Sequence, residues 1–178
     1  MDIMEKWLRL GAVHGLKYSV RVEVATRLEL QTTVTHSFLR SMSFSEQQCR
    51  EFLNCDMSQI TLARQWLEAD EHYFLTLNDP GYPRLLAEAS GCPLYLFVAG
   101  DPKVLSSPQI AIVGSRQCSR YGQHWTDFFA GSFSVSGFTL TSGLAVGIDS
   151  VAHRAALASG GKTIAVLGSG LLNIYPRQ

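Results

Sequence analysis

The segment that decides the fold reads IAIVGSRQCSRYG at residues 110–122. Its first four residues are an unbroken apolar run that stops at a glycine, as expected of a strand buried on both faces of a parallel sheet. A tight turn of small and polar residues follows. Residues 119–135 then suit a helix, with Ser119 or Tyr121 near its start. We therefore predict a strand, a short turn and a helix within residues 110–135.

This unit repeats along the rest of the chain. Strands are predicted at residues 138–141 and 163–167, and a helix at 148–159 is closed by the pair Gly160-Gly161. Strands that alternate with helices in this way pair in parallel, through right-handed crossovers. We expect an α/β fold whose Rossmann-like domain is part of a doubly wound, mainly parallel sheet.

Residues 1–75 have a different character, with apolar residues at helical spacing. Four short helices are predicted. Ser43 or Ser45 can cap the third, with Glu46 placed to complete a capping box with Ser43, and Asp56 or Ser58 can cap the fourth. The segment resembles small all-α modules of the SAM or helix-hairpin-helix type, and a plain helical accessory domain fits it equally well.

Between these regions, residues 78–83 read NDPGYP, a dense turn signal. The run LYLFV at residues 94–98 predicts a strand. We accordingly expect a helical domain at residues 1–75, a linker with a lead-in strand at 76–108, and the Rossmann-like domain at 109–178.

Composition narrows the function classes. The 178 residues are 46% hydrophobic and 17% charged, which is typical of a globular protein. The N-terminus lacks the pattern of a secretory signal, and no apolar run approaches the length of a membrane span. The four cysteines form no CxxC pair and no ligand cluster with histidine, so we expect reduced thiols, a cytoplasmic location and no metal site.

Charge is unevenly distributed although the net charge is zero. Residues 1–109 carry 10 basic and 13 acidic side chains, whereas residues 110–178 carry five basic and two acidic ones. The positive excess therefore falls on the predicted Rossmann-like region, where it can serve an anionic ligand.

All three predicted strands of that region end in turns of small residues. Such turns meet at the carboxyl edge of a parallel sheet, where glycine permits close backbone approach and helix N-termini attract phosphate. We predict a site there that binds the phosphate groups of an anionic ligand. Its candidate residues are Gly114, Ser115, Arg116, Arg120, Ser142, Gly143, Gly147, Gly168, Gly170 and Arg177. Arg120 either joins this site or is solvated.

The turns do not match the usual nucleotide fingerprints. The first lacks the pattern GxGxxG because Arg116 occupies the place of the second glycine, and no acid ends the second strand to hold a ribose hydroxyl. A Walker A loop and a nucleophile elbow are also absent from the sequence. We therefore expect no dinucleotide cofactor, no catalytic residue and no enzymatic turnover.

Three long motifs occur in order: AIVGSR with SxYG after it, SGLAVGID with AH and AL after it, and GKTIAVLGSGL with IYP after it. Together with DPGYPRLL at residues 79–86, they closely resemble the DprA/Smf family of DNA-processing proteins. The resemblance implies a cytoplasmic protein, usually a dimer, that binds single-stranded DNA. It also implies delivery of RecA recombinase onto that DNA during uptake, competence-linked transformation and recombination.

The resemblance also implies roles for single residues. Arg116 matches the family's phosphate-contacting arginine, Ser115, Gly143 and Gly147 would form a backbone pocket, and Arg177 follows the Tyr-Pro pair where a basic residue often assists. The alternative for Arg116 is a salt bridge, for instance with Asp149.

Two acid–base candidates have competing structural readings. Asp149 has the place of a helix cap or first-turn acid. His153, one turn further on, is better read as a packed, hydrogen-bonded histidine than as a general acid or base.

Other function classes remain open at this stage. Related half-Rossmann sheets occur in nucleotide phosphoribohydrolases, but these need a glutamate at a glycine turn, and every glutamate here lies before residue 89. A protein-interaction scaffold is the third class.

Members of the resembled family continue beyond the third strand, so the predicted domain is truncated. We expect the free edge of strand 110–113 to be covered by self-association or by the strand at 94–98.

Overall fold

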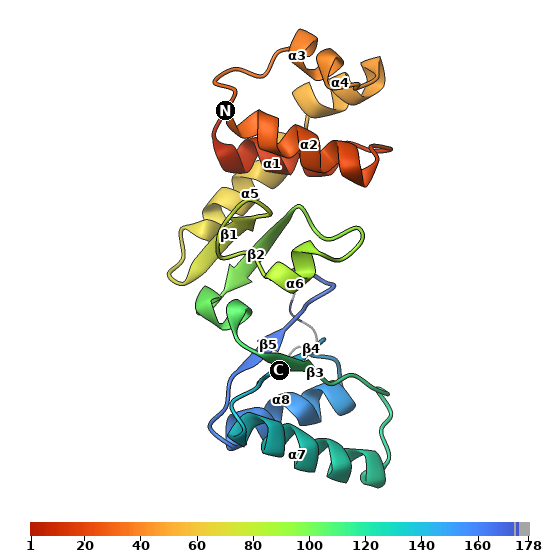
Figure 1. The fold of residues 1–178 in the computed structure, drawn as a ribbon, viewed down its shortest axis with the longest axis vertical. Coiled ribbons are helices and arrows are strands. Elements are labelled where there is room, and N and C mark those ends of the chain that lie inside the picture. The colour runs from red at the N-terminus through yellow and green to blue at the C-terminus, as the bar shows by residue number, and fades with distance from the viewer. Residues whose placement is uncertain (173, 175–178) are drawn as a thin grey trace. The chain divides into compact units, whose positions relative to one another are not determined.

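The computed structural model describes residues 1–172 and 174, which form two compact units (Figure 1). We call Met1–Gly100 the helical unit and Asp101–Gln178 the α/β unit, and each is described by itself. In the described part of the chain no helix has both the length and the apolar character needed to cross a membrane.

The helical unit holds six helices and a two-stranded sheet among its described residues. Their bounds are α1 Ile3–Ala12, α2 Tyr18–Glu29, α3 His36–Ser41, α4 Glu46–Leu53, α5 Met57–Leu67, β1 His72–Thr76, α6 Arg84–Ala87 and β2 Tyr95–Ala99. The four predicted helices correspond to α1, α2, α4 and α5, whereas α3, α6 and β1 were not predicted. β1 and β2 pair antiparallel, from His72 opposite Ala99 to Thr76 opposite Tyr95.

The N-terminus of α4 is fixed by a capping box. The Ser45 hydroxyl accepts from the Gln48 amide at 3.2 Å, and the Gln48 side chain accepts from the Ser45 amide at 2.9 Å. The box predicted between Ser43 and Glu46 is therefore wrong. Ser43 has a φ of 64° and turns the chain in the left-handed region before the helix begins. Asp56 caps α5, as one of the two predicted alternatives.

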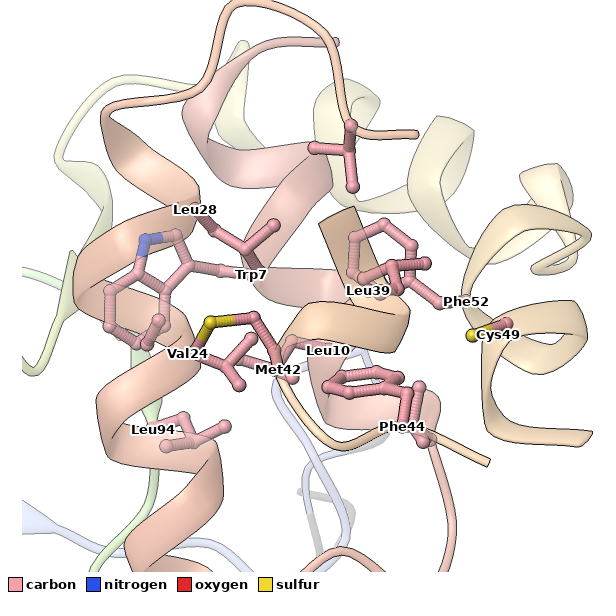
Figure 2. Close-up of a cluster of buried hydrophobic side chains, with 13 residues drawn as sticks. Trp7, Leu10, Val24, Leu28, Leu39, Met42, Phe44, Cys49, Phe52 and Leu94 are labelled. Carbon is pink, nitrogen blue, oxygen red and sulfur yellow. The ribbon is translucent and has the colours of Figure 1, made fainter. Parts of the chain in front are cut away.

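A single core holds the helical unit together (Figure 2). Its largest fully buried side chains come from α1, α4 and the turn before α4, namely Trp7, Phe44 and Phe52. The guanidinium of Arg9 is also buried, and it donates to the carbonyls of Phe52 at 2.9 Å and Leu53 at 2.8 Å. Arg9 thereby ties α1 to carbonyls at the C-terminal end of α4 that have no partner within their own helix.

The α/β unit confirms the predicted Rossmann-like class. Its elements are the 3-10 helix η1 Pro102–Ser106, β3 Gln109–Ala111, α7 Arg120–Val135, β4 Thr139–Ser142, α8 Ile148–Ala158 and β5 Thr163–Ala165. The strands pair in parallel in the order β3-β4-β5, with Ile110 opposite Leu140 and Thr141 opposite Ile164. Figure 1 shows α7 and α8 on the same face of this sheet, as two successive right-handed crossovers require.

One prediction about the sheet edge is wrong. The strand expected at residues 94–98 is β2, and it pairs with β1 rather than with β3. Among the described residues, no strand pairs with the second edge of β3. The domain limits at residues 75 and 109 are kept as a proposal.

Small residues let α7 and α8 pack closely. The buried core of the α/β unit consists of Ala130 on α7, three alanines on α8 and Leu140 on β4. A Cβ added at Gly161 would lie 2.6 Å from the Ser134 Cβ and 3.2 Å from the Ala156 carbonyl oxygen. No space for a methyl group exists at this position.

We predict that Gly161→Ala lowers the free energy of unfolding by about 1–3 kcal/mol, because the added methyl group overpacks the contact with α7. Urea unfolding followed by circular dichroism measures this difference. Gly168→Ala is the matched control, since a Cβ there meets nothing within 4 Å, and it should change stability by about 0.5 kcal/mol or less. Equal effects of the two substitutions would contradict the packing argument.

Candidate nucleic-acid interface

The first turn, Gly114 to Ser119, joins β3 to α7 and is exposed except for the partly buried Cys118. The Ser115 hydroxyl accepts from the Gln117 amide at 3.1 Å, and the Ser119 hydroxyl caps α7 by accepting from the Gly122 amide at 3.1 Å. The amides of Ser115 and Arg116 make no hydrogen bond within the described residues. The turn therefore presents free N–H groups just before a helix N-terminus, where anions are favoured.

The second turn, residues 142–147, is a loop of unusual backbone conformation that we call the glycine loop. Gly147 has a φ of 91°, and Leu144 has a φ of 59°, which is uncommon for a branched side chain. The loop is fixed from inside by Asp149, whose Oδ2 accepts from the amides of Gly143 at 3.2 Å and Ala145 at 3.4 Å. Asp149 is only 7% exposed. It is a first-turn acid of α8, as one of its predicted roles stated.

The first turn and the glycine loop touch directly. A Cβ on Gly147 would collide with the Ser115 carbonyl oxygen and lie 2.7 Å from that of Arg116. The Ile148 amide donates to the same Ser115 oxygen at 3.2 Å. A Cβ on Gly114 would in turn lie 2.7 Å from the Ile148 side chain. Only glycine at 114 and 147 permits this approach, so these two residues shape the site rather than bind through a side chain.

The third turn follows β5. The Val166 amide donates to the Ser142 carbonyl at 2.9 Å, which continues the strand pairing up to the turn. Gly168 and Gly170 lie beyond it and are exposed. Arg177 lies outside the described residues.

Two members of the predicted set need correction. The Ser142 side chain cannot face a ligand, because the residue is 3% exposed and its hydroxyl donates to the Ile112 carbonyl at 2.6 Å. The Gly143 amide cannot donate to a phosphate while it donates to Asp149. The backbone pocket expected from Ser115, Gly143 and Gly147 is therefore reduced to the amides on the side of the first turn.

The basic side chains remain available. Arg116 and Arg120 are exposed, and neither forms an ion pair with another residue in the described ranges 1–172 and 174. The alternative salt bridge between Arg116 and Asp149 is not formed, since the Asp149 carboxylate faces the glycine loop. Arg116 and Arg120 thus lie within or next to the turn that carries the two free amides, a combination suited to a phosphodiester.

His153 is packed as the structural reading predicted. Its Nδ1 lies 2.6 Å from the Thr163 hydroxyl, which itself donates to the Leu140 carbonyl at 2.8 Å. The hydroxyl must therefore accept from the ring, so Nδ1 carries the proton and Nε2 is unprotonated in the neutral ring. Nε2 is buried without a hydrogen-bond partner in the described part of the chain. Burial lowers the pKa of His153 below 6.5, and nearby Asp149 opposes this only in part.

The chemistry that this arrangement offers is electrostatic. No three His, Cys, Asp or Glu side chains within residues 1–172 and 174 gather as a metal site. What the carboxyl edge provides is a rigid turn with free amides and guanidinium groups.

Sequence comparison shows which known families the chain matches. The family described as "DNA recombination-mediator protein A" matches residues 73–178, and the "SMF/DprA SAM domain" matches residues 1–65. The chain belongs to the DprA/Smf family. The expected resemblance is thereby confirmed, as is the SAM-like nature of the helical segment.

Individual members of the DprA/Smf family agree with this assignment. Protein Smf of Escherichia coli K12 is 38% identical over 174 residues, covering 98% of this chain and 46% of the relative. The X-ray structure of DNA processing protein A from Streptococcus pneumoniae superposes with a TM-score of 0.76 at 28% identity, covering 99% of this chain and 62% of that one.

A second DprA structure comes from a relative described as binding single-stranded DNA. DNA processing protein A from Helicobacter pylori, described as having a unique single-stranded DNA binding mode, matches with a TM-score of 0.51 at 32% identity. The match covers 58% of this chain and 46% of that one. This chain thus spans about half the length of these DprA/Smf relatives.

We predict that the free energy of unfolding falls as pH drops below about 6.5, because the unfolded chain then binds a proton that folded His153 resists. This contribution is fully present above the unfolded pKa and is lost as pH falls toward the lowered folded pKa. Urea titrations between about pH 5 and pH 8 measure it. The pH dependence should flatten in His153→Asn. His124→Asn, which removes an exposed histidine of α7, is the control, and equal profiles for the two variants would contradict the assignment.

Proposed function

We propose that this chain binds single-stranded DNA through the first turn of its α/β unit, as a DNA-processing protein without enzymatic turnover. The observation that carries the proposal is the exposed Arg116 guanidinium beside the free amides of Ser115 and Arg116. The close contacts that Gly114 and Gly147 permit fix the backbone of this turn. The DNA-processing family of the chain, and the single-stranded DNA ligand of the H. pylori relative, support the same ligand class.

Phosphates supply the affinity in this proposal, so binding should depend strongly on salt. With about two to four phosphates neutralised, the logarithm of the association constant should fall with that of salt at a slope of about −1.5 to −3. Arg120 and the α7 N-terminus lie next along the chain and extend the cationic surface. Gly168, Gly170 and Arg177 are further proposed contacts. Tyr121, which is 74% exposed, is a further proposed contact, through stacking on a base.

Fluorescence-anisotropy titration with a labelled oligonucleotide tests the proposal. Arg116→Ala should weaken binding by about 1–3 kcal/mol, because a charge-assisted contact is lost. Arg154→Ala, which removes another exposed charge from the middle of α8, should have a much smaller effect. Single-stranded DNA should bind more tightly than duplex.

Unchanged affinity of Arg116→Ala would remove this turn from the binding site. Incubation with nucleoside monophosphates separates the alternative enzyme class, the phosphoribohydrolases, because release of free base would replace the binding role by hydrolysis. If no polynucleotide binds at low salt, a role as a protein-interaction scaffold becomes the better hypothesis for this chain.

We also propose that the chain self-associates through α7. An aromatic row on this helix is exposed to solvent, and it consists of Trp125, Phe128 and Phe129. The Trp125 ring contacts both phenylalanines, with centroids 5.8 and 5.7 Å apart. A contiguous apolar surface of this kind marks an interaction site, and the edge of β3 that no described strand covers belongs to the same unit. The homodimer implied by the family is the proposed product.

Sedimentation velocity over a range of protein concentrations should show this association. Phe128→Glu should shift the equilibrium toward monomer, because it places a charge within the aromatic row. Gln123→Glu adds the same charge at another exposed position of α7 and should leave the association unchanged. A wild-type chain that stays monomeric at every concentration would contradict the proposal.

The remaining parts of the family role are proposed on the resemblance. They are a cytoplasmic location, action in DNA uptake and transformation, and partnership with RecA recombinase. The description of the family as a recombination mediator supports the RecA partnership.

A further inference from the structure

The glycine loop already binds an anionic group of the protein itself, the carboxylate of Asp149. Its amides at 143 and 145 converge on a single oxygen, Oδ2 of Asp149, at 3.2 and 3.4 Å. The Ser150 hydroxyl fixes the same loop from the other side by donating to the Ala145 carbonyl at 2.6 Å. A buried carboxylate is costly unless hydrogen bonds satisfy it, so loop and carboxylate stabilise each other.

The far end of this loop supports the first turn. Leu144 takes its left-handed conformation between the two amides that Asp149 holds. The chain then reaches Gly147, whose backbone lies against the Ser115 and Arg116 carbonyls, and the Ile148 amide, which donates to Ser115. A continuous set of contacts therefore runs from the Asp149 carboxylate to the backbone of Arg116.

We propose that Asp149 is a positioning residue for DNA binding, which sets the backbone of the Ser115–Arg116 turn by holding the glycine loop in its strained conformation. Asp149 does not touch DNA in this arrangement, because its carboxylate is buried and points to the loop amides. The inference rests on the proposed function in one respect, namely that Arg116 contacts phosphate.

The sign of the effect separates this role from simple electrostatics. Removal of an acidic side chain near a DNA site reduces repulsion and should tighten binding. Loss of a positioning carboxylate should weaken binding, because the loop relaxes and Arg116 no longer presents its guanidinium together with the turn amides. Asp127 on α7 provides the comparison, since it is an exposed acid of the same unit.

The experiment measures single-stranded oligonucleotide affinity by anisotropy, with the full chain and five variants: Asp149→Ala, Asp149→Asn, Asp127→Ala, Arg116→Ala and the double variant Asp149→Ala/Arg116→Ala. Asp149→Ala should bind about tenfold more weakly, the scale of one charge-assisted contact. Asp149→Asn should lose less, because its side-chain oxygen can still accept from the loop amides. Asp127→Ala should bind as well as the wild type or better.

The double variant shows whether Asp149 acts through Arg116. If it does, the two losses are not additive, and Asp149→Ala costs little in a chain that already lacks the guanidinium. The salt slope of Asp149→Ala should also become shallower by about 0.7, as for the loss of one phosphate contact. A substitution that only destabilised the fold would lower the fraction of folded molecules. Those molecules would keep the wild-type dependence of DNA affinity on salt.

Formate supplies a rescue that a general structural role would not show. The cavity left in Asp149→Ala retains two converging amides, so formate should restore part of the affinity, whereas chloride at the same ionic strength should not. Thermal unfolding followed by circular dichroism identifies the folded variants. If Asp149→Ala does not fold, Asp149→Asn and its double variant with Arg116→Ala decide the question.

The outcomes separate the two proposals. If Arg116→Ala loses affinity while both Asp149 variants bind like the wild type or more tightly, or if the losses add fully, the positioning role is overturned and the DNA site stands. If Arg116→Ala itself binds normally, the proposed site fails first, and the positioning role fails with it.

Discussion

The approach of one backbone to another, Gly147 against the Ser115 and Arg116 carbonyls, is the constraint on which the rest of the site depends. Parallel pairing of β3, β4 and β5 brings their carboxyl ends to one edge, but pairing alone does not fix the conformation of the turns. The glycine contact removes that freedom, because a side chain at either position would force the turns apart. Arg116 thus belongs to a turn whose backbone conformation is fixed by contact with the glycine loop.

Much of this could be predicted from the sequence, because the signals were local and strong. The apolar run before Gly114 marked β3, and the paired glycines at 160 and 161 marked the end of α8. Regular alternation of strands and helices then left few topologies to consider. The residues alone predicted only a ligand that carries phosphate. The resemblance of three ordered motifs to one family then implied that this ligand is single-stranded DNA.

The errors arose where a local pattern had two readings or none. Ser43 and Glu46 have the spacing of a capping box, yet Ser45 with Gln48 forms it, and spacing cannot choose between overlapping candidates two residues apart. β1 was missed because HYFLT at residues 72–76 follows a helix without a turn signal, and its pairing with β2 depends on tertiary context. Ser142 was placed in the site because it precedes a glycine. Its side chain in fact belongs to β4 and bonds to the neighbouring strand. The contact between Asp149 and the loop amides was not predicted, because spacing places Asp149 in the first turn of α8 but does not show which amides its carboxylate reaches.

The three tryptophans occupy three different environments, and this gives the molecule its own optical reporters. Trp7 is fully enclosed in the aromatic core of the helical unit, and Trp66 stacks on His72 with ring centroids 3.8 Å apart. Trp125 alone belongs to the described part of the α/β unit, where it is 39% exposed. In the unassociated chain a collisional quencher such as iodide will reach Trp125 first, while Trp7 keeps a blue-shifted emission. Intrinsic fluorescence can therefore follow the melting of each unit separately in the unlabelled chain.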